Sequence, residues 1–153
     1  MRRILISLLA LLCMASCGRR RNAPAQEAAA DSRPRVFLPA IAPSSLSPDE
    51  RRDYLRVHYW DRFDFTDTLF TVRADTLQMV EAYARYIALI SDRPTDGSPI
   101  DSLMRRASSS RKMLDYFSML AEQVLHDPNS PLRNDEFYIP VLQAQLRSPW
   151  YDE

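Results

Sequence analysis

Hydrophobic residues recur at helical spacing through most of the chain after residue 47. From Asp75 to Ser91 they follow the three- and four-residue steps of a helix, at Leu77, Met79, Val80, Tyr83, Ala84, Tyr86, Ile87 and Ile90. A later stripe contains Leu114, Phe117, Ala121 and Val124. These stripes predict helices over residues 75–90 and 99–126, and the second helix could continue through the serines at 108–110 or bend there.

Helix-start signals predict two further helices. Ser47 and Glu50 form a capping box, in which a serine and an acid each accept a hydrogen bond from a backbone N–H. This box predicts a helix over residues 48–60. Asn134, followed by two acids, predicts the start of another helix. Pro140 lies too deep for a first-turn proline, so we expect it to kink this helix or to mark its true start.

Glycine is almost absent from the helical part of the sequence. After Gly18 only Gly97 remains, although hairpin turns and sheet corners commonly need glycine at positive φ. The apolar stripes are wide, so each helix must pack on more than one neighbour. We therefore predict an all-α fold, a small bundle of about four helices over residues 47–153, after a disordered N-terminal tether.

The first residues have the pattern of a secretory signal peptide. Arg2 and Arg3 precede an apolar run of about half the 20 residues that a membrane-spanning helix needs. The residues Met14-Ala15-Ser16-Cys17 resemble the lipobox of bacterial lipoproteins. The resemblance implies a signal peptide over residues 1–16 and lipidation of Cys17, with anchoring by palmitate-type acyl chains. The alternative is ordinary cleavage, which would leave Cys17 as a plain thiol.

Residues 17–46 are rich in Ala, Pro, Arg and Ser, a composition typical of an extended linker. We predict a lipidated tether here, with one apolar island, Val36-Phe37-Leu38, that could dock on the helical body or on a partner. Gly18 differs from the aspartate of inner-membrane retention signals. An acidic surface-export signal is also missing. Similarity to lipoprotein sorting patterns therefore implies the outer membrane, on its periplasmic face.

Charge and cysteine content exclude several classes of function. Twenty basic residues balance twenty acidic ones, which is not the footprint of a nucleic-acid-binding protein. Cys13 lies in the predicted signal peptide and Cys17 would carry lipid, so the mature chain would have no free thiol for disulfide, zinc or redox chemistry. The sequence lacks a G-x-S-x-G elbow and a glycine-rich phosphate loop. We expect no enzymatic activity and no cofactor.

The densest group of chemically versatile side chains lies between residues 58 and 67. His58, Asp61 and Asp64 are spaced by three, so they would converge on a metal if the helix continued. The competing interpretation places the aromatic residues in the core and lets the acids cap the next turn or pair with Arg62. We favour this second interpretation and expect no metal site. The candidate binding residues are His58, Trp60, Asp61, Phe63, Asp64 and, on a proline-rich loop, Arg133.

Several motifs together resemble an uncharacterised helical domain of Bacteroidetes-type lipoproteins. They are His58-Tyr59-Trp60-Asp61 with Phe63-Asp64-Phe65, Tyr116-Phe117, the loop from Asp127 to Asn134, and Tyr138-Ile139-Pro140-Val141-Leu142. The resemblance extends from Pro39 to about Pro149. Longer relatives often continue into a thioredoxin-like domain with a C-x-x-C motif. The present sequence lacks that motif, so we expect no redox activity and transfer no functional residue.

Three short triplets resemble the acceptor sites for O-glycans in such periplasms. Their hydroxyl residues are Thr68, Thr76 and Ser102, each between an aspartate and a leucine. The same residue types are also ordinary helix-start residues, with Asp, Ser and Thr as caps. Both interpretations stay open at this point.

Three hypotheses for function follow. The first is a lipid-tethered, non-catalytic adaptor that docks a periplasmic protein, which could be thioredoxin-like. The second is a periplasmic small-ligand or peptide binder, with an aromatic groove built from Tyr54, Trp60, Phe63 and Phe65. The third is a hydrolase that uses carboxylates. A large exposed apolar patch would favour the adaptor, a pocket of about 300 Å³ or more the binder, and buried acids in a cleft the enzyme.

Overall fold

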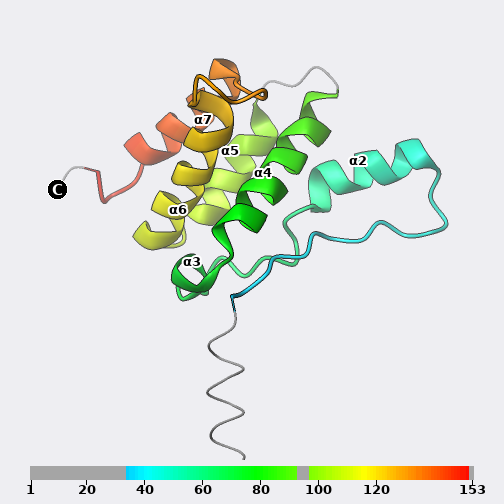
Figure 1. Cartoon of the computed structure of the whole chain (residues 1–153), viewed down its shortest axis with the longest axis horizontal. Coiled ribbons are helices and arrows are strands. Elements are labelled where there is room, and N and C mark those ends of the chain that lie inside the picture. Colours follow the sequence, from blue (N-terminus) through cyan, green and yellow to red (C-terminus); the bar gives the residue numbers. More distant parts are fainter. Residues whose placement is uncertain (1–33, 93–96, 152–153) are drawn as a thin grey trace, which may run out of the picture. The chain divides into compact units, whose positions relative to one another are not determined.

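The computed structural model describes residues 34–92 and 97–151 (Figure 1). Its elements are α2 (Pro48–His58), α3 (Phe70–Arg73), α4 (Thr76–Ser91), α5 (Ser98–Ala107), α6 (Arg111–Ala121), the π-helical turn η1 (Glu122–His126) and α7 (Asp135–Leu146). No strand occurs within these ranges, and a single isolated bridge pairs Arg35 with Ala74 in parallel. The predicted all-α class is confirmed. The predicted signal peptide, Cys17 and the tether up to residue 33 lie outside the described residues.

The long helix expected over residues 99–126 is divided into α5, α6 and η1. The serine run interrupts it, because the Ser108 hydroxyl bonds to the Met104 carbonyl oxygen and Ser110 caps α6 by accepting from the Met113 N–H. Pro140 lies inside α7, which begins at Asp135. It does not mark the start of that helix.

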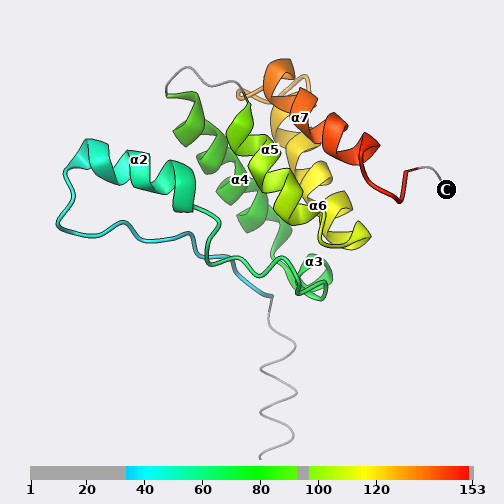
Figure 2. The same cartoon turned by 180° about the vertical axis from the view of Figure 1, so that it is seen from behind.

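Helices α4 to α7 enclose the apolar core. Helix α5 packs on α6 and α7, and α4 packs on α6 and η1 (Figures 1 and 2). The largest fully buried side chains belong almost entirely to these elements, and they are Tyr83, Phe117, Met79, Ile87, Ile100, Met104, Met113, Leu114, Leu120, Leu125 and Val141. The expected wide stripes are therefore shared among several neighbours.

Gly97 begins α5 at a position that no other residue would fit well. Its φ is +80°, in the left-handed region that favours glycine. A Cβ at this position would lie 3.0 Å from Cγ of Pro140, which belongs to α7. The glycine thus serves both the turn into α5 and the close contact between α5 and α7.

Residues 34–46, which we call the N-terminal segment, belong to the same compact unit as the helices. This unit begins at Pro34. Phe37 is only 3% exposed, whereas Val36 and Leu38 are 55% and 60% exposed. One residue of the apolar island therefore docks on the helical body, and its two neighbours face outward.

Helix α2 contains no buried residue. Its start is the predicted capping box, with Ser47 and Glu50 bonded reciprocally. It contacts α4 through polar groups, since Arg56 Nε donates to the Leu89 carbonyl oxygen at 3.2 Å and also pairs with Asp92. The apolar anchors follow the helix, at Tyr59 and Trp60.

Candidate functional site

The three residues considered as an alternative metal triad do not converge. Helix α2 ends at His58, and His58 Nδ1 lies 2.6 Å from Asp61 Oδ2. The other oxygen of Asp61 pairs with Arg106 at 3.2 Å. Asp64 instead caps its own turn, accepting from the N–H and hydroxyl of Thr66 at 2.9 and 2.7 Å. Among the described residues, no three His, Cys, Asp or Glu side chains lie close enough to hold a metal ion.

These hydrogen bonds hold the carboxylates in their ionised form. The hydrogen bond from His58 is the main cause of the lowered pKa of Asp61, with Arg106 contributing. Hydrogen bonds from Thr66 lower the pKa of Asp64. A general acid needs a raised pKa, so neither carboxyl has the shift that an acid catalyst would require.

Most of the residues proposed for an aromatic groove form part of the core instead. Trp60, Phe63 and Phe65 are buried and surround Phe117, with ring centroids 5.2–5.3 Å from its ring. Tyr54 stacks on His58, with ring centroids 4.2 Å apart. These four aromatic side chains therefore do not form a groove, and that prediction is wrong.

Phe37 closes this aromatic cluster from the N-terminal segment. Its ring stacks on Trp60, with centroids 4.6 Å apart and planes at 14°. Arg106 covers the cluster on another side, because its guanidinium lies 4.5 Å from the Phe65 ring centre and donates to the Trp60 carbonyl oxygen. The cluster therefore links the N-terminal segment, the chain after α2 and the core helices.

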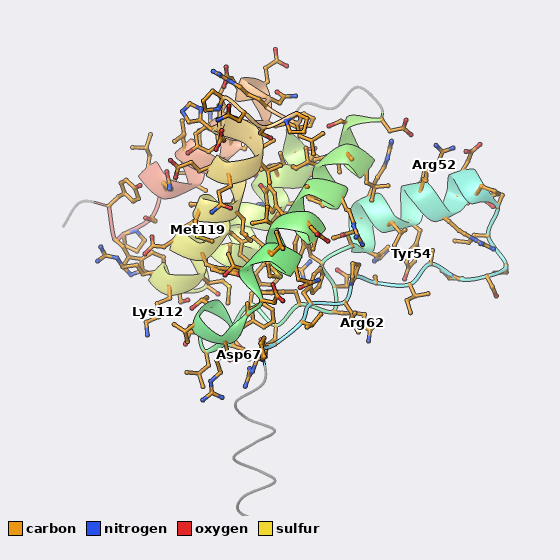
Figure 3. All side chains as sticks on the ribbon, viewed as in Figure 1. Arg52, Tyr54, Arg62, Asp67, Lys112 and Met119 are labelled. Atoms are coloured by element: carbon orange, nitrogen blue, oxygen red, sulfur yellow. The ribbon has the colours of Figure 1, made fainter. Side chains whose placement is uncertain are left out.

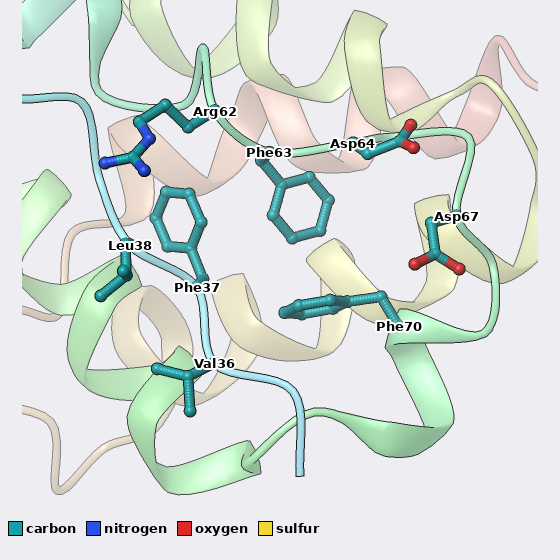
Figure 4. A pocket seen from close by; sticks show the side chains of 8 residues that line it. All are labelled: Val36, Phe37, Leu38, Arg62, Phe63, Asp64, Asp67 and Phe70. Atoms are coloured by element: carbon teal, nitrogen blue, oxygen red, sulfur yellow. The ribbon is translucent and has the colours of Figure 1, made fainter. Parts of the chain in front are cut away.

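A pocket of about 250 Å³ opens beside Phe37 (Figure 4). It is lined by Val36, Phe37, Leu38, Arg62, Phe63, Asp64, Asp67 and Phe70. Phe63 forms part of its wall, with its ring centroid 5.6 Å from that of Phe37 and 4.9 Å from that of Phe70. Of the candidate binding residues, the pocket unites only Phe63 and Asp64. In the sequence, the apolar island indicated the opposite wall of the pocket, whereas Arg62, Asp67 and Phe70 were not singled out as binding residues.

The charged side chains around the pocket differ in whether a partner within the chain holds them. Asp67 pairs with Arg35, and Asp64 is held by Thr66. The Arg62 side chain is exposed, points away from the helices (Figure 3) and makes no ion pair or hydrogen bond with any described residue. Arg62 is thus the uncompensated cation at the edge of an apolar floor.

Arg133 lies apart from this pocket, at the turn that leads into α7. Its guanidinium is 3.6 Å from Asp135, in the first turn of that helix. Asp127 stabilises the preceding loop by accepting from the Asn129 N–H at 2.7 Å. The loop is a structured corner, and Arg133 has a carboxylate neighbour within the chain.

Several buried polar groups belong to residues that do not line this pocket. Among the described residues, five buried side-chain atoms lack a hydrogen-bond partner, and they are Trp60 Nε1, Tyr83 OH, Tyr116 OH, Ser118 Oγ and Ser148 Oγ. Burial raises the pKa of Tyr116 to about 12 and that of Tyr83 further. These phenols therefore stay neutral.

The three predicted glycan acceptors lie in a turn, at a helix start and within a helix. Thr76 is the first residue of α4 and Ser102 lies in α5, and both are exposed, whereas Thr68 is half-buried. Asp75 caps α4 by accepting from the Gln78 N–H. The capping role of that aspartate is observed, and glycosylation stays a prediction.

The chain is thus an all-helical protein with a small apolar pocket, and it belongs to a family described as "Domain of unknown function (DUF5106)". The family model matches residues 16–153. This result confirms the predicted resemblance to an uncharacterised domain. No curated protein matches the chain.

One solved structure is similar, that of a thioredoxin-like protein from Bacteroides caccae. The two share 36% sequence identity with a TM-score of 0.63. The match covers 75% of the present chain and 42% of the other, so the chain spans less than half of that relative. None of the helices in the described part is long and apolar enough to cross a membrane.

Proposed function

We propose that the protein is a non-catalytic interaction module of the cell envelope, anchored through lipid on Cys17 and serving a thioredoxin-like protein. The observation that carries this proposal is the likeness to the Bacteroides caccae protein. A helical unit 36% identical to this chain occurs there in a protein described as thioredoxin-like. Units that occur together in one relative can act together as separate chains.

The described side chains are consistent with a role in binding. The carboxyl pKa values shifted at Glu50, Asp61 and Asp64 are all lowered by hydrogen bonds. The free surface instead offers exposed apolar side chains beside the pocket, at Val36 and Leu38. Such groups favour contact with another molecule over acid–base chemistry.

Anchoring is tested by replacing the cysteine that would receive lipid. Labelled palmitate should enter the wild-type chain and not Cys17→Ala, and the variant should move from the membrane fraction to the soluble fraction. Unlabelled wild-type protein, or unchanged fractionation of Cys17→Ala, would overturn the anchor. Cys13→Ala is the matched control, because that residue precedes the predicted cleavage site.

The partner is tested separately by cross-linking in the native envelope, followed by purification and mass spectrometry. We expect recovery of a protein with a thioredoxin-like sequence, enriched over a lipoprotein of similar abundance. Recovery of the chain without any such protein would contradict the adaptor role.

A second candidate function is peptide or small-ligand binding, and the pocket is the observation that favours it. Its volume of about 250 Å³ is below the range of about 300–1,000 Å³ typical for drug-sized ligands. The pocket therefore suits one large side chain of a peptide better than a free small molecule.

A further inference from the structure

The N-terminal segment follows an extended course (Figure 1), and the hydrogen bonds of Arg35 and Phe37 use one edge of it. Arg35 donates to the Arg73 carbonyl oxygen at 2.7 Å, and its own carbonyl accepts from the Asp75 N–H at 3.1 Å. Two residues on, the Phe37 N–H donates to Gln78 Oε1 at 3.1 Å, and Gln78 Nε2 donates to the Phe37 carbonyl at 2.7 Å. The side-chain amide of Gln78 thus takes the place of a neighbouring strand.

The opposite edge is open at Val36 and Leu38, whereas further along the segment the Ala40 N–H donates to the Tyr59 carbonyl oxygen at 3.2 Å. In an extended chain, the backbone groups of successive residues face opposite edges, so those of Val36 and Leu38 face away from Gln78. These two residues make no hydrogen bond with any described residue. An open edge of this kind can pair with another extended chain.

The pocket lies beside this open edge, because Val36 and Leu38 form part of its lining. Its other apolar walls are the rings of Phe37, Phe63 and Phe70 (Figure 4). A strand that paired with residues 36–38 could therefore direct a side chain into an apolar space. Main-chain hydrogen bonds would supply affinity, and the pocket would select the side chain.

The positive charge of Arg62 at the edge of the pocket indicates which charged residue a docking chain would place there. Arg62 has no partner among the described residues, whereas the nearby Asp67 is neutralised by Arg35. A carboxylate on the incoming chain would compensate Arg62 without displacing an existing contact. A basic residue at that place would instead meet a like charge.

We propose that this edge and pocket form a docking site for an extended segment of a partner protein. The segment pairs with Val36 and Leu38, inserts one large apolar side chain among the three phenylalanine rings and places a carboxylate against Arg62. The inference rests on the proposed interaction role, and it assigns that role a surface and a partner chemistry.

The test uses the full chain and two blocked seven-residue peptides. Both consist of threonines around a central leucine, and the residue two positions before the leucine is aspartate in one and lysine in the other. In an extended peptide, this spacing puts both side chains on one face. We expect the aspartate peptide to shift the amide NMR signals of Val36 and Leu38 and to bind about fivefold more tightly than the lysine peptide.

Two variants separate backbone pairing from charge. Leu38→Pro removes a backbone N–H that has no partner among the described residues. The residue before it, Phe37, already has the extended conformation that a following proline requires. The substitution should weaken binding about tenfold, as expected for a lost hydrogen bond with steric hindrance. Arg62→Glu should reverse the preference between the peptides. Leu77→Ser, at an exposed position outside the pocket, is the control and should bind like wild type.

Absence of chemical-shift changes at millimolar peptide would overturn the site, as would equal binding by wild type and Leu38→Pro with an unchanged circular dichroism spectrum. If Leu38→Pro does not fold, the reversal in Arg62→Glu still decides the proposal, because that side chain has no hydrogen bond or ion pair to lose among the described residues. A cross-linked partner whose contacts avoid residues 36–38 would sustain the interaction role and exclude this surface.

Discussion

Helices α2 and α4 lie against each other, yet only α4 contributes buried side chains. Six residues of α4 are buried and none of α2 is. Helix α4 is positioned by apolar packing along its length, whereas α2 is positioned by its cap, its arginines and the aromatic residues that follow it. A helix can therefore be fixed at its ends, and its stability then depends on local contacts more than on the core.

Among the substitutions that test this comparison, we expect the largest loss of stability from one at the centre of the core. Phe117 is fully buried and is surrounded by the rings of Trp60, Phe63 and Phe65. Phe117→Ala should lower the free energy of unfolding by about 3–5 kcal/mol, because it leaves a cavity among rigid rings. Urea denaturation measures the loss. A change below about 1 kcal/mol would show that the cluster is not part of the cooperative core.

Phe37→Ala tests whether the N-terminal segment belongs to that core. We expect a loss of about 3 kcal/mol, at the lower end for a buried phenylalanine, since the segment can partly collapse into the space. The exposed neighbour provides the matched control, and Val36→Ala should change stability by less than about 0.5 kcal/mol. Equal effects of the two substitutions would contradict the docked position of Phe37.

Ser47→Ala tests the independent attachment of α2. Loss of the cap should cost about 1 kcal/mol, and the effect should be local because α2 has no buried residue. Hydrogen exchange should become faster in α2 and stay unchanged in α4 to α7. Uniform acceleration throughout the unit would mean that α2 unfolds together with the core. Ser44→Ala, in the loop before the helix, is the control.

The smallest effect concerns pH. The lowered pKa of Asp61 means that its contribution to stability is present in full above the ordinary value of 3.8 and is lost as the pH falls through the lowered pKa. The half-exposed ion pair between Asp61 and Arg106 should contribute less than about 1 kcal/mol to the free energy of unfolding. Asp61→Asn should therefore destabilise at pH 7, and its difference from wild type should shrink as the pH falls below 3.8. Asp115→Asn, at an exposed position of α6, controls for general charge effects.

Local signals in the sequence predicted much of the fold. The capping box specified the start of α2, and the apolar stripe specified α4. Both depend only on residues a few positions apart. The serine run was recognised as a point where the third helix could bend. Whether it continued depended on the hydrogen bonds of Ser108 and Ser110, which the stripe itself does not encode.

The candidate site was less predictable, because it is assembled from distant parts of the chain. Its walls come from residues 36–38 and 62–70, and Gln78, 41 positions after Phe37, holds the first wall in place. His58, Asp61 and Asp64 were selected on helical spacing, but the helix ends at His58. Tyr59 and Trp60 lie in the core, as the favoured interpretation of this segment expected, and the groove of the binder hypothesis does not form.

The parallel pairing of Arg35 with Ala74 also determines how this unit would respond to mechanical force. A pull on the chain at Pro34 reaches the two backbone hydrogen bonds of Arg35 first. The two bonds between Phe37 and Gln78 follow, and the stacked ring of Phe37 comes next. Tension from the N-terminal side would thus detach the segment stepwise from α3 and α4 and would expose the face of Trp60 before the pull reaches α2.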